Sequence, residues 1–341
     1  MLIARAPVRV SFFGGGTDLA SYYTQYGGAV LSTAINKYVY VILNVSEKHT
    51  LQITSSDYRA YYRLPRGEAL LWDGDLSLPR AALHHFGVDE GVSVFLASEI
   101  PPGTGLGSSS SVTVGLCKAI SVASGQNLSK HQLAELACEI EINKLAKPIG
   151  VQDQYASAFG GINWMTFGAE GVKVEPMRLP ESTVQSLESS LLLMFTGASH
   201  DSAEILRQQN KSSAEKNARV IESLQATHEL ARTAKALLES GNLDAFGRLF
   251  DTAWQYKRRF AAGVSTEAID RAYAIAKNNG ALGGKITGAG GGGFLLLYCE
   301  PSTINRVELA LTAEGLRRMD FAFERDGARV LFNAGLLLNK Q

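Results

Sequence analysis

Residues 101–111 read Pro101-Pro102-Gly103-Thr104-Gly105-Leu106-Gly107-Ser108-Ser109-Ser110-Ser111. They follow a strand-like segment, Val92–Ala97, and lead into Ser109–Ser124, where small and apolar residues recur at helical spacing. Glycine lets the backbone come close to an anion, and the start of a helix offers free N–H groups and the positive end of its dipole. The serines add hydroxyl groups for phosphate oxygens or a metal ion. This pattern predicts a phosphate-binding loop, with a flexible turn as the alternative.

A second glycine cluster lies immediately before the strand-like segment Phe294–Tyr298, and it reads Lys285-Ile286-Thr287-Gly288-Ala289-Gly290-Gly291-Gly292-Gly293. Consecutive glycines lose much conformational entropy on folding. We therefore expect the backbone of this cluster to approach something closely, because only such an approach would require so many residues without side chains. A hairpin turn is the alternative.

Charged residues at four other positions can complete a site for group transfer. Arg9 offers a permanently charged group with several donors, and Asp18, just after three glycines, can accept hydrogen bonds from hydroxyls. Glu141 lies on a predicted helix and Asp153 follows the turn after it, an arrangement that suits one metal ligand and one general base. Each residue also has a structural alternative, which for Glu141 is a solvated helix face.

Composition excludes several classes of protein. The 341 residues are 45% apolar and 19% charged, which is typical of a soluble globular protein. Lys plus Arg and Asp plus Glu number 33 each, so no overall field favours nucleic acid or an anionic membrane. The three cysteines fit neither a disulfide framework nor a zinc site. Without a signal-peptide pattern or an apolar run of about 20 residues, we expect a cytoplasmic protein.

The remaining pattern predicts two α+β lobes that share a cleft. A helix is expected from Ser129, which forms a capping box with Gln132, and the composition shifts near residue 185. The second half contains a strand-like segment, Ser190–Phe195. It also contains two helical stretches, Ser213–Glu239 stopped by Gly241 and Glu267–Asn279 ending at Gly280.

Three motifs together resemble those of the GHMP kinases, the family of galactokinase, homoserine kinase, mevalonate kinase and phosphomevalonate kinase. They are A-P-x-R, P-P-G-x-G-L-G-S-S-S and K-I-T-G-A-G-G-G-G, and they occur in the family's order between residues 6 and 293. The resemblance implies an α+β fold with an N-terminal ATP-binding lobe, residues 1–185, and a ferredoxin-like C-terminal lobe with added helices, residues 186–341. It also implies an active site in the cleft, with ATP and Mg²⁺ as cofactors.

The resemblance assigns roles by position. Ser109 and Glu141 match the family's Mg²⁺ ligands, Asp153 matches the aspartate that faces the reacting hydroxyl, and Arg9 matches the arginine that stabilises charge beside it. Little covalent chemistry is expected of the protein, because positioning and charge stabilisation dominate phosphoryl transfer. The residues expected to bind the nucleotide are Pro102, Gly103, Gly105, Leu106, Gly107, Ser108, Ser109, Ser110, Gly288, Ala289 and Gly290.

The acceptor is suggested by Gly14-Gly15-Gly16-Thr17-Asp18, where galactokinases usually have Gly-Glu-His-Thr-Asp. The Gly-Gly-Gly-Thr-Asp form resembles the bacterial D-glycero-D-manno-heptose 7-phosphate kinases and the kinase part of fucokinases. The first resemblance implies phosphorylation of the anomeric hydroxyl to the 1,7-bisphosphate, for nucleotide-activated heptose. The residues expected to bind this sugar phosphate are Gly15, Gly16, Thr17, Asp18, Lys37 and Lys257.

Three alternatives stay open. The acceptor can be an unphosphorylated sugar such as L-fucose, or the chain can be a catalytically silent member that binds sugar. Residues 257–259 can be a solvated surface cluster, since charges usually lie in water. The oligomeric state is also open, with a homodimer as one option.

Overall fold

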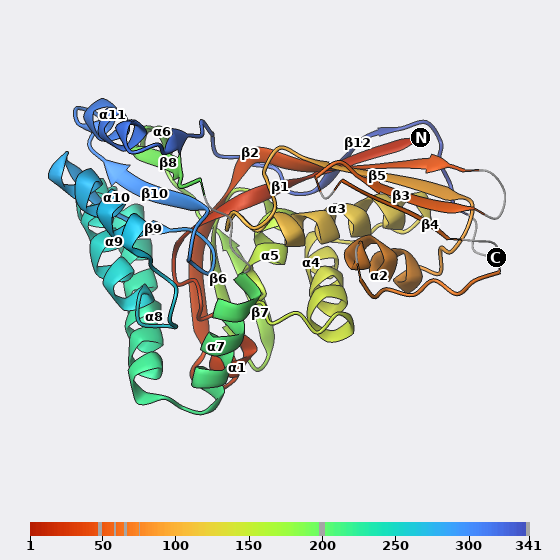
Figure 1. The fold of residues 1–341 in the computed structure, drawn as a ribbon, viewed down its shortest axis with the longest axis horizontal. Helices are drawn as coiled ribbons and strands as arrows, with labels where there is room; N and C mark the ends of the chain where they lie inside the picture. The colour runs from red at the N-terminus through yellow and green to blue at the C-terminus, as the bar shows by residue number, and fades with distance from the viewer. Residues whose placement is uncertain (47–49, 58, 65–66, 75, 198–201, 339–341) are drawn as a thin grey trace.

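The computed structural model of the protein describes residues 1–46, 50–57, 59–64, 67–74, 76–197 and 202–338. Within these residues, two β-sheets and the helices packed on them form an elongated molecule with two lobes (Figure 1). The predicted two-lobed α+β fold is confirmed.

The first lobe contains an eight-stranded sheet with the order β12-β1-β2-β5-β3-β4, in which β6 also pairs with β2 and β7 with β6. Apart from the parallel pair β3–β5, neighbouring strands are antiparallel. Its strands are β1 (Leu2–Phe13), β2 (Gly28–Val45), β3 (Leu51–Ser55), β4 (Ala60–Leu64), β5 (Val92–Ser98), β6 (Ile162–Gly168), β7 (Gly171–Pro176) and β12 (Arg329–Asn333).

The helix that follows the first glycine loop packs against β1 and β2 and is largely apolar, as its central position requires. The predicted capping box is present: Ser129 and Gln132 bond reciprocally at the start of α4. That helix continues into a π-helical segment, η1 (Glu139–Lys144). The helices of this lobe are α1 (Ala20–Tyr26), α2 (Ser77–His85), α3 (Ser108–Ala123), α4 (Lys130–Cys138) and α5 (Gln152–Phe159).

The second lobe contains a four-stranded antiparallel sheet with the order β11-β8-β10-β9. Helices connect β8 to β9 and β10 to β11, which gives the split β-α-β arrangement of a ferredoxin-like fold, as predicted. Its strands are β8 (Leu191–Phe195), β9 (Ala281–Ile286), β10 (Phe294–Cys299) and β11 (Arg317–Arg318). Its helices are α6 (Glu181–Ser189), α7 (Ser202–Ala214), α8 (Ala218–Glu239), α9 (Leu243–Lys257), α10 (Glu267–Asn278) and α11 (Ile304–Ala313).

One predicted helix is wrong at its start. The stretch Ser213–Glu239 is divided, because α7 ends at Ala214 and α8 begins at Ala218. Lys216 between them has a φ of 55°, and the side chain of Asn217 accepts a hydrogen bond from the Val220 N–H. Asparagine is among the best N-cap residues, so it begins a new helix here instead of continuing the first one.

The two lobes share an apolar core. Phe12 and Phe13 at the end of β1 pack against Phe246 and Phe250 of α9, with ring centroids 4.5 to 6.4 Å apart. The chain then returns to the first lobe at its end, since β12 pairs with β1. The division into 1–185 and 186–341 stays a prediction, and the last strand of the second range lies in the first sheet. None of the helices over the described residues has the length and hydrophobicity needed to cross a membrane.

Candidate active site

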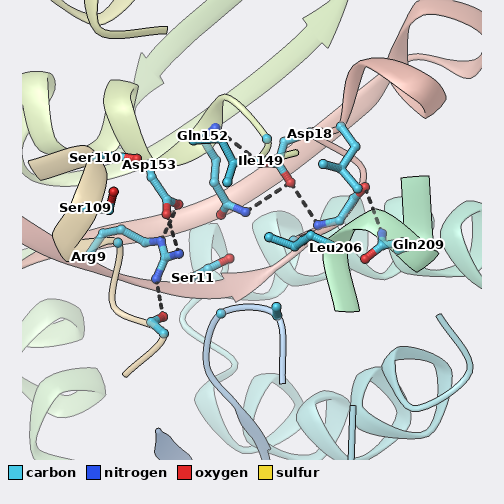
Figure 2. Close-up of a pocket in the computed structure, with 18 of the residues that line it drawn as sticks. Arg9, Ser11, Asp18, Ser109, Ser110, Ile149, Gln152, Asp153, Leu206 and Gln209 are labelled. Carbon is cyan, nitrogen blue, oxygen red and sulfur yellow. Dashed lines mark hydrogen bonds and ion pairs between the residues drawn. The ribbon is translucent and has the colours of Figure 1, made fainter. Parts of the chain in front are cut away.

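A pocket lined by residues of both lobes contains most of the predicted site. Figure 2 shows Ser109 and Ser110 at one end, Asp18, Leu206 and Gln209 toward the other, and Asp153 between them. The lining residues are Arg9, Ser11, Gly15, Gly16, Asp18, Leu19, Gly103, Gly105, Gly107, Ser108, Ser109, Ser110, Ile149, Gly150, Gln152, Asp153, Leu206, Gln209, Lys257, Phe260, Lys285, Gly288 and Ala289. Residues from positions 9 to 289 therefore meet in one cavity.

The two glycine segments pack against each other at this pocket. The second one connects β9 to β10, so it is a hairpin loop, and it also makes the close approach that its glycines predict. A Cβ on Gly288 would lie 2.5 Å from the Gly105 Cα, and one on Gly105 would lie 2.7 Å from the Thr287 carbonyl oxygen. Both glycines have positive φ. The two loops therefore present one continuous backbone surface to the pocket.

The helix α3 begins at this surface. The Ser111 N–H donates to the Gly107 carbonyl, so the N–H groups of Ser108 to Ser110 precede the first hydrogen bond of the helix. Free N–H groups and the helix dipole make this end suitable for phosphate. Pro102, Leu106 and Gly290, which were also predicted to bind nucleotide, do not line the pocket; Leu106 is buried in the core.

Arg9 and Asp153 form a two-pronged ion pair beside Ser109 and Ser110 (Figure 2). Arg9 Nε lies 2.7 Å from Asp153 Oδ1, and Nη2 lies 2.8 Å from Oδ2. The third guanidinium nitrogen, Nη1, donates to the Gly105 carbonyl at 2.7 Å. Asp153 lies in the first turn of α5, where a carboxylate is favoured by the helix dipole. This pair fixes the orientation of the carboxylate relative to the glycine loop.

Glu141 contacts Ser109 and is fully buried, so the alternative of a solvated helix face is wrong for it. Its carboxylate accepts hydrogen bonds from Gln154 Nε2 at 2.7 Å and from Ser109 Oγ at 3.2 Å. The ammonium of Lys147 lies 3.5 Å from Glu141 Oε1 and donates to Ser109 Oγ at 2.9 Å. Lys147 was not predicted, because nothing in the linear pattern connects it with the serine loop.

Asp18 is held at the other end of the pocket. It accepts hydrogen bonds from the Gly16 N–H at 2.9 Å and from the Gln152 N–H and Nε2 at 3.2 and 3.0 Å. Burial raises the pKa of Asp18, and the negative charge of Asp153 adds to this effect. Thr17 is different: its hydroxyl donates to the Gly14 and Ala29 carbonyls. Thr17 holds the turn and does not line the pocket, contrary to its predicted role.

The two predicted lysines have different positions. Lys257 lines the pocket, so the alternative of a purely solvated surface cluster does not apply to it. Lys37 lies at an irregularity in the β1–β2 pairing and does not line the pocket, so the structure gives no support to its predicted contact with the acceptor.

Sequence reasoning missed several lining residues near Asp18. Ser11 Oγ and Gln152 Oε1 are buried and have no hydrogen-bond partner among the described residues. Gln209 Nε2 lies 3.4 Å from the Gly16 carbonyl, and Leu206 precedes it by one helical turn on α7. Phe260 lies on the same side. The unpartnered oxygens can serve a ligand with several hydroxyls, because buried polar groups normally require partners.

Comparisons with known proteins agree with this geometry. Residues 77–161 match the family described as GHMP kinases N terminal domain, and residues 233–316 match GHMP kinases C terminal. A D-glycero-alpha-D-manno-heptose 7-phosphate kinase of Campylobacter jejuni is 30% identical, over 95% of this chain and 97% of the relative. A crystal structure described as a D-glycero-D-manno-heptose 1-phosphate kinase from Bacteroides thetaiotaomicron has a TM-score of 0.83 and 28% identity, covering 98% of this chain and 100% of that one. A galactokinase from Lactococcus lactis, with a TM-score of 0.75 and 17% identity over 96% of this chain and 94% of its own, shares the fold.

Proposed function

Because this chain belongs to the GHMP kinases and is an ATP-dependent kinase that acts on a sugar, we propose that its acceptor is D-glycero-D-manno-heptose 7-phosphate. The reaction transfers the γ-phosphoryl group of ATP to the anomeric hydroxyl. The observation that carries the proposal is the position of the Arg9–Asp153 pair between the serine loop and the buried Asp18–Gln152 group. This arrangement suits a hydroxyl-rich acceptor next to a nucleotide.

The nucleotide would lie on the backbone surface of the two glycine loops. The N–H groups at the start of α3 would donate to the phosphate oxygens of ATP, and the dipole of that helix would favour their negative charge. The glycines at 105 and 288 matter here because no side chain stands between the phosphates and the backbone.

Ser109 and Glu141 fit a magnesium ion, because Mg²⁺ prefers oxygen ligands and is often held by one carboxylate together with substrate phosphates. The described residues include no cluster of three or more His, Cys, Asp or Glu side chains for a metal, so the remaining ligands would be nucleotide oxygens and water. When bound, the ion would neutralise charge on the β- and γ-phosphates. The Lys147 ammonium contacts both residues in this structure. It would either stay beside a bound Mg²⁺ or move away from it.

Asp153 would accept a hydrogen bond, and then the proton, from the reacting hydroxyl. Arg9 holds both carboxylate oxygens, which orients Asp153 and leaves the guanidinium beside the transferring group. An anomeric hydroxyl is more acidic than an ordinary alcohol, so a weak base is sufficient. Asp18, Gln152 and Ser11 would bind other hydroxyls of the sugar.

The two heptose kinase names differ in the position of the phosphate, so the phosphorylation state of the acceptor needs a direct test. ADP release should be measured with heptose 7-phosphate, the free heptose and L-fucose at equal concentrations. We expect the highest kcat/KM with heptose 7-phosphate. A clear preference for a free sugar would contradict the proposed acceptor. Saturable sugar binding without ADP release from any member of the panel would contradict catalysis and favour a silent sugar-binding protein.

A further inference from the structure

Two lysines on the loop side of the pocket are not explained by the mechanism above. Lys257, the last residue of α9, donates hydrogen bonds of 2.6 Å to the Ile286 and Gly288 carbonyls. Lys285 lies on β9 directly before these residues and is only 5% exposed. Both side chains line the pocket.

The positive charges of these lysines lack negative partners. Among the described residues, neither lysine forms an ion pair with a carboxylate, and the nearby Arg9 is already paired with Asp153. Burial, together with the charge of Arg9, lowers the pKa of Lys257 to about 7. Burial and the charges of Lys257 and Arg9 lower the pKa of Lys285 well below its ordinary value. Lys285 is buried and Lys257 is partly buried, and cations shielded from water without a carboxylate partner are costly, so the site favours a bound anion.

The contacts of Lys257 locate that anion. Lys257 bonds to the Gly288 carbonyl, and Gly288 packs against Gly105, whose carbonyl accepts the hydrogen bond from Arg9. Lys257 and Arg9 therefore lie on either side of the junction between the two glycine loops. This junction is the predicted nucleotide surface, whereas the acceptor residues Asp18 and Gln209 lie toward the other end of the pocket (Figure 2).

We propose that Lys257 is a catalytic residue that contacts the γ-phosphoryl group of ATP during transfer, and that Lys285 is a positioning residue that supports it. An ammonium group has three N–H donors, and the two carbonyls use two of them. The third donor is left for a phosphoryl oxygen. This assignment replaces the predicted role of Lys257 in binding the sugar phosphate.

The transfer step balances without a proton from Lys257. A bond forms between the acceptor oxygen and the γ-phosphorus, while the bond to the β,γ-bridging oxygen breaks and its electron pair leaves with ADP. The hydroxyl proton goes to Asp153. Lys257 stays protonated and stabilises the charge on the transferring oxygens, as cationic groups do in other phosphoryl-transfer sites. The proposal rests on the ATP-dependent kinase activity and is independent of which sugar accepts the phosphoryl group.

The test compares Lys257→Met, Lys257→Arg and Lys285→Met with the unchanged protein. The affinities for ADP and for the non-hydrolysable analogue AMPPNP are measured by calorimetry without sugar, and kcat and KM are measured with the best acceptor. Lys211→Met, on an exposed side chain of α7, is the matched control. Circular dichroism reports whether each variant is folded.

We expect Lys257→Met to weaken AMPPNP binding about tenfold or more, because a charge-assisted hydrogen bond is lost, and to leave ADP binding nearly unchanged. Its kcat should fall by about 10²-fold or more. Lys257→Arg, which keeps a charge there, should retain part of the preference for AMPPNP over ADP, and it carries the test if the Met variant does not fold. Lys285→Met should reduce this preference less than Lys257→Met.

Two results would overturn the proposal. If AMPPNP and ADP affinities fell equally, Lys257 would only hold the glycine loop in place. If nucleotide affinities were unchanged while the KM for a phosphorylated acceptor rose, Lys257 would bind the phosphate of the acceptor instead. Neither result depends on whether heptose 7-phosphate is the preferred sugar, so failure of this assignment can be distinguished from failure of the proposed acceptor.

Discussion

Asp153 is the proposed base for the reacting hydroxyl of the acceptor. Asp153→Asn should keep the shape of the side chain and remove its capacity to accept a proton. We expect kcat to fall about 10²–10⁴-fold, as is typical for loss of a general base, while AMPPNP affinity changes little. Steady-state kinetics and calorimetry measure the two quantities. Asp326→Asn, at an exposed ion pair, is the control. Unchanged turnover in Asp153→Asn would contradict the proposal that Asp153 acts as the general base.

Lys257 gives a prediction for stability as a function of pH. Its folded-state pKa of about 7 lies below the ordinary value of 10.5, with Arg9 and Lys285 as its cationic neighbours and Asp153 beyond Arg9. The fold therefore disfavours the protonated form. The loss of folding stability caused by the protonated lysine is fully present below about pH 7, and it disappears as the pH rises toward 10.5.

Lys257→Met removes this cost. The Tm of the variant minus the Tm of the unchanged protein should therefore increase as the pH is lowered from 9 to 6. Differential scanning calorimetry at both pH values measures the shift. A difference in Tm that does not change with pH would show that Lys257 is not held in a charge-disfavouring environment.

At this scale the sequence identified charged residues inside motifs, although other motif residues such as Thr17 and Leu106 do not line the pocket. Arg9, Asp18 and Asp153 were found because each lies next to glycines or in a family motif, and all three line the pocket. Lys147 and Gln209 were missed because only folding brings them to the site. Lys37 was favoured for its charge alone, and it does not line this pocket.

The paired glycine loops are the element that forms the proposed nucleotide surface. Gly288→Ala should introduce both a strained positive φ and a clash with the Gly105 backbone. Gly125→Ala is the matched control, because Gly125 also has a positive φ but a Cβ there meets nothing within 4 Å. We expect the control to cost about 1 kcal/mol of stability, and Gly288→Ala to cost more and to weaken ATP binding. Equal effects of the two variants on stability and nucleotide affinity would mean that the contact between the loops is unimportant.

The elements themselves could largely be predicted where local chemistry defines them. The helix beginning at Ser129 was found from its capping box, and the first strand of the second lobe from its apolar run. The break between α7 and α8 was missed because residues 213–239 are helix-forming on both sides of it. Only the cap at Asn217 marks the new start.

The whole molecule is held together by a core that crosses both lobes. Phe246 of α9 packs against Phe12 and Phe13 of β1 and is fully buried. Phe246→Ala should cost about 3–5 kcal/mol, and calorimetry should still show one transition, because both lobes depend on the same contacts. Phe332→Ala, at a half-exposed position of β12, should change stability far less. Two separate transitions in the unchanged protein would contradict this coupling.

The return of the chain to the first lobe could not be predicted from the sequence. The strand β12 is short and mostly exposed, so it carries little hydrophobic pattern, and its pairing with β1 joins residues more than 300 positions apart. By contrast, the two-lobed architecture followed from the pattern of strand-like and helical segments, and from three motifs spread along the chain. Long-range pairing of a weakly patterned strand leaves no local signal.

The most direct test of the kinase and its acceptor is the position of the transferred phosphoryl group on the product. The protein is incubated with ATP, Mg²⁺ and heptose 7-phosphate, and the product is followed by phosphorus NMR. We predict a new phosphate monoester signal coupled to the anomeric proton, absent with Asp153→Asn, together with the retained signal of the 7-phosphate. A product phosphorylated at any other hydroxyl, or ADP formation without a new ester, would contradict the account.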